Sequence, residues 1–194
     1  CGITAWSGKI ERFDAFHFIC QPAASNFALV VRVLDIRSSQ PWAKAGLMIR
    51  EGLSSGSRHA SLFGTAGHGL IFNHRPLMNR ETFDSTDVQM DVPYWLKLVR
   101  WGDVFTGYCS TNGENWRLVE RVVMNMTNDV FVGFAVCSRS SQNDCVGWFD
   151  EFRIEAADKP EETPVTGNGD GLRAQFFAGR DVVGEQANGW IARR

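Results

Sequence analysis

The feature that most constrains this chain is a succession of short apolar runs, rich in β-branched and aromatic residues, between residues 14 and 154. Clusters of Gly, Pro, Ser and Asn separate these runs, as turns separate strands. No stretch keeps an apolar period of 3.6 residues long enough to indicate a helix. Strands are expected over residues 16–20, 27–36, 45–50, 59–63, 70–73, 94–101, 104–110, 116–124, 130–137 and 146–154. So many short strands predict an all-β antiparallel sandwich or barrel.

Composition and charge exclude two classes of function. The 194 residues are 44% hydrophobic and 22% charged, which supplies enough apolar material for a packed core. Lys and Arg number 20 and Asp and Glu number 22, so the net charge is −2. A chain without a basic excess cannot neutralise a phosphate backbone, so nucleic-acid binding is not expected. No apolar run approaches the roughly 18 residues of a membrane span, so membrane insertion is not expected either.

Two connections are typical of β-hairpins. Asn112-Gly113 lies between two alternating strands, and this dipeptide readily adopts the positive φ angles of a tight turn. A second hairpin is expected to pair residues 130–137 with residues 145–154 in antiparallel fashion, through residues 138–144.

The second hairpin predicts a disulfide bond between Cys137 and Cys145, which flank its connection. Cα atoms paired across antiparallel strands lie about 4.5–5.5 Å apart, a separation that a disulfide tolerates. The chain has five cysteines, and in a secreted protein an odd number indicates a partner elsewhere; the full connectivity, including that of Cys1, stays open. The alternative is that the cysteines are reduced, buried thiols that pack as small apolar residues.

The composition changes after residue 155, which predicts two domains. Residues 1–155 form the β-sandwich, and residues 156–169 are rich in proline, glycine and charge, as an interdomain linker is. Residues 170–194 begin a new strand but are too few for a core of their own. Because the chain starts at Cys1, we interpret it as a fragment of a larger protein. A mature bacterial lipoprotein, which also starts with cysteine, is the alternative.

Three stretches resemble a known family: residues 41–51 (PWAKAGLMIRE), 56–60 (GSRHA) and 94–102 (YWLKLVRWG). They are similar to a concanavalin A-like, laminin G-like jelly-roll module of the "regulation of enolase" type, over residues 14–154. The resemblance implies a jelly-roll β-sandwich in an extracellular or cell-surface protein of several domains, often beside glycoside hydrolases. Cys20 and Cys109 stand where the family has aromatic residues, which implies a second disulfide pair.

The end of the chain carries a second resemblance. Residues 169–181 (GDGLRAQFFAGRD) are similar to the opening of a protective-antigen-type β-domain, which binds carbohydrate in adhesins and glycosidases. The resemblance implies a sugar-binding context. The loops that bind calcium and sugar in that family lie beyond this sequence, so no site residue is carried over.

No catalytic, metal or cofactor motif is present in the sequence. Retaining glycosidases need two carboxyl groups about 5–5.5 Å apart, which a strand supplies as acid-x-acid. Asp150-Glu151 is instead an adjacent pair whose side chains point to opposite faces. The four histidines have no metal-ligand spacing, and residues 64–69 lack the Lys-Ser/Thr of a phosphate loop. We therefore expect no enzyme activity, no metal and no cofactor.

Aromatic residues provide the candidate ligand site. The chain has seven tryptophans, and sugars stack their C–H faces on such rings. The predicted ligand-binding residues are Trp42, Arg50, Arg58 and His59. The alternative is that most tryptophans are core, and that Lys44 and Arg50 form structural ion pairs with Glu51 or Asp35.

The most direct interpretation is a non-catalytic extracellular module that binds glycans or glycoproteins. One alternative is a structural building block of an extracellular filament, which would bind copies of itself or other surface proteins. A further alternative is an accessory module of a glycoside hydrolase. Asn125-Met126-Thr127 is a glycosylation sequon, so Asn125 is expected to carry a glycan if the source is eukaryotic.

Overall fold

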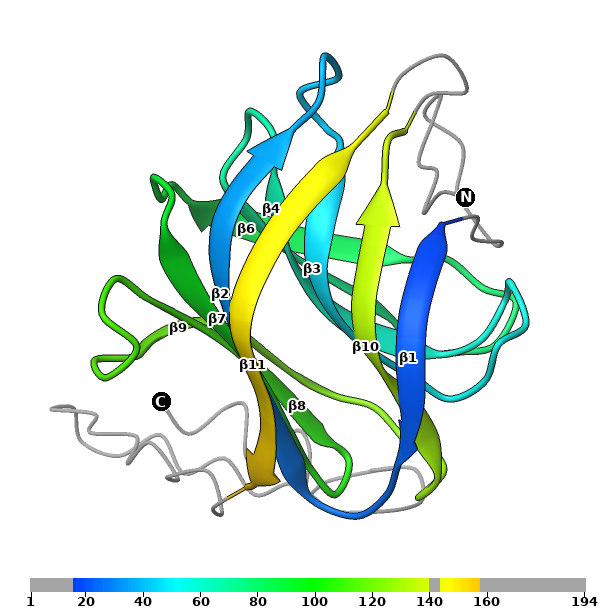
Figure 1. Ribbon diagram of the computed structural model, residues 1–194. Coiled ribbons are helices and arrows are strands. Elements are labelled where there is room, and N and C mark those ends of the chain that lie inside the picture. The colour runs from blue at the N-terminus through cyan, green and yellow to red at the C-terminus, as the bar shows by residue number, and fades with distance from the viewer. Residues whose placement is uncertain (1–15, 140–143, 158–194) are drawn as a thin grey trace, which may run out of the picture. The chain divides into compact units, whose positions relative to one another are not determined.

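The computed structural model describes residues 16–139 and 144–157. Within these residues the chain forms eleven strands and no helix, and the strands lie in two antiparallel sheets (Figure 1). Sheet A has the order β1 (His17–Ala23), β10 (Val130–Cys137), β3 (Lys44–Arg50), β4 (His59–Thr65), β5 (Leu70–Arg75) and β6 (Phe83–Val88). Sheet B has the order β11 (Val146–Ala156), β2 (Phe27–Arg37), β7 (Tyr94–Trp101), β8 (Val104–Ser110) and β9 (Arg117–Val123). The expected antiparallel jelly-roll β-sandwich is confirmed.

The main core fills the space between the two sheets. Alternate residues of each strand point inward because the side-chain period of a strand is two. The core takes side chains from both sheets, among them Leu29, Val31, Leu47, Ile49, Leu62, Phe72, Leu96 and Leu98. Each such side chain contributes about 1.5–3 kcal/mol when it leaves water, so this layer holds the sandwich together.

Sheet A is buried on its other face as well. Met48, Phe63, Ala135 and Cys137 form a second apolar cluster there. Every residue of β3 is therefore buried, which explains why its sequence lacks the alternation of a half-exposed strand.

The predicted hairpin between residues 130–137 and 145–154 is wrong. β10 pairs with β1 and β3 in sheet A, whereas β11 pairs with β2 at the edge of sheet B. The chain therefore changes sheets between these two strands. Each of the two strands therefore pairs with other strands and not with its neighbour in the chain.

The predicted disulfides are also wrong. Cys137 and Cys145 form no disulfide with each other; Cys137 ends β10 of sheet A, and Cys145 directly precedes β11 of sheet B. Cys145 Sγ lies 3.9 Å from the carbonyl oxygen of Lys44, and burial raises the pKa of Cys145 to about 11. Cys20 and Cys109 are likewise unbonded, on β1 of one sheet and β8 of the other.

Other expectations had different outcomes. The hairpin at Asn112-Gly113 is confirmed: β8 pairs with β9, and Gly113 has a φ of 77°. The strand β6 was not expected, because its polar sequence shows little apolar pattern; it lies at an edge of sheet A, where fewer residues are buried.

The linker over residues 156–169 lies almost wholly outside the described residues. The second domain over residues 170–194 and Cys1 lie outside them entirely, and these remain predictions.

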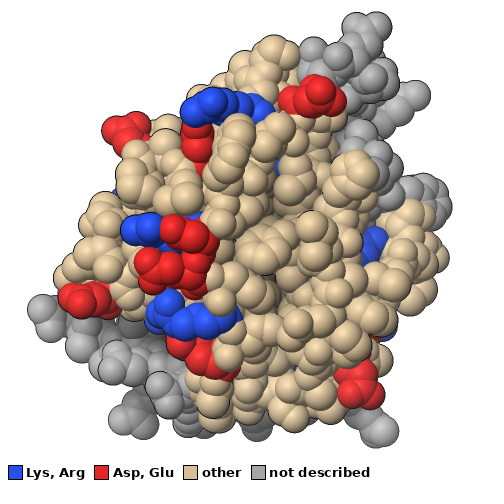
Figure 2. All heavy atoms as spheres, in the orientation of Figure 1, with Lys and Arg blue, Asp and Glu red and all other residues tan. Residues whose placement is uncertain are grey.

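Charges on the face formed by β2 and β11 compensate one another. Figure 2 shows basic and acidic side chains alternating in a band on this face. The ion pairs there are Arg37–Asp35, Arg32–Asp150 and Arg153–Glu155. Such a face has no surplus of one sign with which to attract a polyanion.

Candidate functional site

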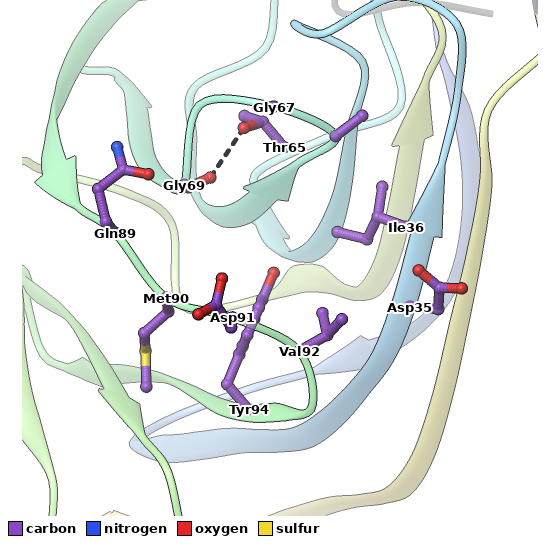
Figure 3. Close-up of a pocket in the computed structure, with 11 residues that line it drawn as sticks. Asp35, Ile36, Thr65, Gly67, Gly69, Gln89, Met90, Asp91, Val92 and Tyr94 are labelled. Atoms are coloured by element: carbon purple, nitrogen blue, oxygen red, sulfur yellow. Dashed lines mark hydrogen bonds between the residues drawn. The ribbon is translucent and has the colours of Figure 1, made fainter.

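A pocket lies at one end of the sandwich, where three separate connections meet (Figure 3). The end of β2, the turn between β4 and β5, and the loop before β7 form its walls, and its volume is about 300 Å³. We call it the rim pocket. Its lining residues are Asp35, Ile36, Thr65, Ala66, Gly67, Gly69, Gln89, Met90, Asp91, Val92 and Tyr94.

The turn between β4 and β5 is held by its own hydrogen bonds. Thr65 donates its hydroxyl to the carbonyl of Gly69 at 2.9 Å and accepts from the backbone N–H of His68 at 2.7 Å. Gly69 has a φ of 71°, a conformation that glycine adopts without steric cost. The turn is thereby a fixed wall of the pocket and not a free loop.

The connection before β3 packs against this turn and carries Trp42. The backbone N–H of Gly67 donates to the carbonyl of Pro41 at 2.9 Å. Trp42 stacks on His68, with ring centroids 3.7 Å apart and an interplanar angle of 20°. Trp42 is 44% exposed, and the guanidinium carbon of Arg139 lies 6.0 Å from the centroid of its ring.

The polar groups of the pocket differ in how they are held. The carboxylate of Asp35 accepts from Nε of Arg37 at 2.6 Å. The amide of Gln89 donates to the carbonyl of His68 at 3.4 Å. Asp91 and Tyr94 direct their carboxylate and hydroxyl toward the turn at residues 65–69 (Figure 3). Burial raises the pKa of Tyr94, so its hydroxyl stays protonated.

Three of the predicted ligand-binding residues are far from Trp42. β3 begins just after Trp42 and ends at Arg50, so it spans roughly 20 Å at about 3.3 Å per residue. Arg50 is paired with His59 across β3 and β4, and both are buried on the face of sheet A that turns away from the main core. Arg58 precedes His59 at that same end.

Arg58 has a clear structural role. Its guanidinium lies 3.4 Å from the carboxylate of Glu51 and donates to the carbonyl of Asn125 at 2.7 Å. Glu51 in turn accepts from the backbone N–H of Thr127 at 3.0 Å. The pair fixes the connection between β9 and β10. Asn125, the predicted glycosylation site, is exposed on that connection.

Sequence analysis did not identify Asp91, Tyr94 or Gln89. The lining residues come from segments about 20 residues or more apart, and no local motif joins them. One wall comes from the glycine-rich stretch 64–69, which sequence analysis had considered only to reject it as a phosphate loop. A metal site is not formed within residues 16–139 and 144–157, where no three His, Cys, Asp or Glu side chains converge. The same residues include no helix that could cross a membrane.

Solved structures with the same fold include three proteins of different kinds. A functionally unknown protein from Saccharomyces cerevisiae has a TM-score of 0.61 at 21% identity, over 75% of this chain and 77% of that chain. A mutant of the GH43 protein BlXynB from Bacillus licheniformis has a TM-score of 0.54 at 18% identity, over 68% and 28%. The carbohydrate-binding module CBM66 from Bacillus subtilis has a TM-score of 0.52 at 17% identity, over 70% and 78%.

These likenesses establish the fold and not an activity. The expected concanavalin A-like type of β-sandwich is confirmed. This chain corresponds to only 28% of the GH43 protein's length. No protein-family model and no curated protein sequence matches the chain.

Proposed function

We propose that this β-sandwich is a non-catalytic carbohydrate-binding module that holds a sugar at the rim pocket, against the Trp42–His68 pair. The observation that carries the proposal is the partly exposed ring of Trp42, stacked on His68 beside the turn that forms one wall of a pocket lined by carboxylates, an amide and hydroxyls. Sugars present C–H faces that stack on aromatic rings and hydroxyl groups that bond to such polar groups.

The fold supports this proposal by analogy. CBM66 is a carbohydrate-binding module of similar fold, with a TM-score of 0.52. The sequence resemblance to a "regulation of enolase" module, and of residues 169–181 to a protective-antigen-type domain, is in keeping with an extracellular or cell-surface protein of several domains. In such a protein the partners are glycans or glycoproteins.

The arrangement of the two aspartates in the pocket argues against hydrolysis. A glycosidase uses two carboxyl groups that flank one sugar bond. Asp35 is bonded to Arg37, and Figure 3 draws it across the pocket from Asp91, with Ile36 and Val92 between them in that view. Asp35 is held by Arg37, which argues against its acting with Asp91 as such a pair.

A second candidate function is that of an accessory module in a glycoside hydrolase. The observation that favours it is the similarity to one part of the GH43 protein, which this chain matches over 28% of that protein's length. This alternative keeps the same glycan-binding site and differs only in the protein to which the module belongs.

The test is a glycan array followed by calorimetry on the intact chain and two variants. Trp42→Ala should weaken binding at least tenfold, about 1.4 kcal/mol, because a stacking platform is lost. The exposed position of Trp42 predicts little change in the melting temperature. Trp101→Ala is the matched control, since Trp101 is also partly exposed but lies at the opposite end of β7 from Tyr94. Release of reducing sugar is measured in parallel and should be absent.

Two results would contradict the proposal. The first is binding to no glycan, together with regular polymers in electron micrographs, which would favour the structural building block. The second is an unchanged affinity in a folded Trp42→Ala variant, which would place the sugar elsewhere.

A further inference from the structure

The rim pocket has an uncompensated negative charge. Asp35 is neutralised by Arg37, at 2.6 Å. Asp91 has no ion-pair or hydrogen-bond partner within the part of the chain that the structure describes. No Lys, Arg or His is among the described residues that line the pocket. A ligand at this position therefore meets the negative charge of Asp91 and no basic group in the pocket wall.

Tyr94 supplies a second polar group of the pocket. The residue is only 3% exposed, and its hydroxyl points into the pocket below the turn at residues 65–69 (Figure 3). Among the described residues it has no hydrogen-bond partner. The hydroxyl packs against Gly64, where a Cβ atom would collide with it. The hydroxyl oxygen itself borders the open space of the pocket, where an oxygen of a ligand can accept its hydrogen bond.

The rest of the lining suits a small ring. Ile36, Met90 and Val92 offer an apolar surface for C–H groups. A volume of about 300 Å³ is at the lower end of the range for ligand pockets, which leaves room for a single sugar residue.

We infer that the rim pocket selects a sugar residue that bears no carboxylate or sulfate group. In this arrangement the carboxylate of Asp91 accepts hydrogen bonds from hydroxyls of the sugar, and the hydroxyl of Tyr94 donates to one of its oxygens. An acidic sugar would place a second negative charge against Asp91, and like charges across an interface oppose binding. The inference rests on the proposed glycan-binding function and adds the class of glycan.

The experiment compares neutral and acidic oligosaccharides that share one backbone. The probes are cellohexaose with β-1,4-glucuronan hexamer, β-1,4-mannohexaose with β-1,4-mannuronate hexamer, and methyl-esterified oligogalacturonate with its free acid. They are added to the glycan array and then measured by calorimetry with the intact chain. Neutral glycans should bind, and acidic members should bind at least tenfold more weakly. That difference should shrink in 0.5 M salt, because salt screens the repulsion.

Two variants localise the effect. Asp91→Asn should remove most of the discrimination against acidic glycans. The control is Asp103→Asn. Asp103 is an exposed acid in the turn at the opposite end of β7, and its replacement should leave the discrimination against acidic glycans unchanged. Tyr94→Phe should lower the affinity for neutral glycans about tenfold without lowering the melting temperature, because the hydroxyl has no protein partner to lose.

The outcomes separate this inference from the proposed function. Acidic glycans that bind as well as neutral ones overturn the inference and leave a glycan-binding module. Full affinity in a folded Tyr94→Phe variant also overturns it, since the sugar would then not reach the pocket. An intact chain that binds nothing on the array overturns both.

Discussion

Replacing Arg100 by methionine tests how the chain is held where it passes from sheet B to sheet A. Arg100 is 3% exposed on β7, and its guanidinium donates to the carbonyls of Met126, Thr127 and Asn128 at 2.7–3.1 Å. A fourth bond, from Nε to the carbonyl of Gly102, measures 3.2 Å. Three of the four bonds therefore fix the connection between β9 and β10.

The magnitude follows from these bonds. Four hydrogen bonds at about 1 kcal/mol each give about 4 kcal/mol. Burial lowers the pKa of Arg100, which means that burying the charge costs free energy and offsets part of this gain. Methionine keeps much of the apolar packing of the arginine stem. We expect Arg100→Met to reduce the free energy of unfolding by about 3 kcal/mol, and the melting temperature by about 6–12 °C.

The assay is urea unfolding, followed by tryptophan fluorescence. Arg117→Met, an exposed arginine on β9, is the control and should change the free energy of unfolding by less than about 0.5 kcal/mol. Arg100→Lys keeps the charge but makes fewer hydrogen bonds, so its free energy of unfolding should lie between those of Arg100→Met and the control. The reasoning is refuted if Arg100→Met is as stable as the control.

Two further predictions concern pH and modification. Burial lowers the pKa of His74. The negative charges of Glu120 and Asp84 act in the other direction and raise it, but burial has the larger effect. The unfolded chain therefore binds a proton at higher pH than the folded one, and stability should fall as the pH drops below about 6.5. Urea midpoints at pH 7 and pH 5 measure this loss of stability. His74→Gln should make the loss smaller. An equal loss in the variant would contradict the assignment of the pH dependence to His74. Asn125 is exposed, and secretion from a eukaryotic cell should add one glycan by intact mass, which Asn125→Gln abolishes.

Local sequence patterns predicted most of the strands. Runs of β-branched and aromatic residues between turn clusters matched ten of the eleven strands, because strand formation and turn chemistry depend on near neighbours. The turn at Asn112-Gly113 was predictable for the same reason. β6 was missed, because an edge strand buries few residues and shows little apolar alternation.

Strand partners and the site were decided by the tertiary structure alone. β10 and β11 follow one another in the chain, yet each buries its apolar side by pairing in a different sheet, so Cys137 and Cys145 are not cross-strand partners. The sequence by itself determined an all-β sandwich. Sheet pairing placed Arg50 on a buried face. It also brought Asp91 and Tyr94 to one pocket. That pairing joins residues distant in the chain, and no local pattern encodes it.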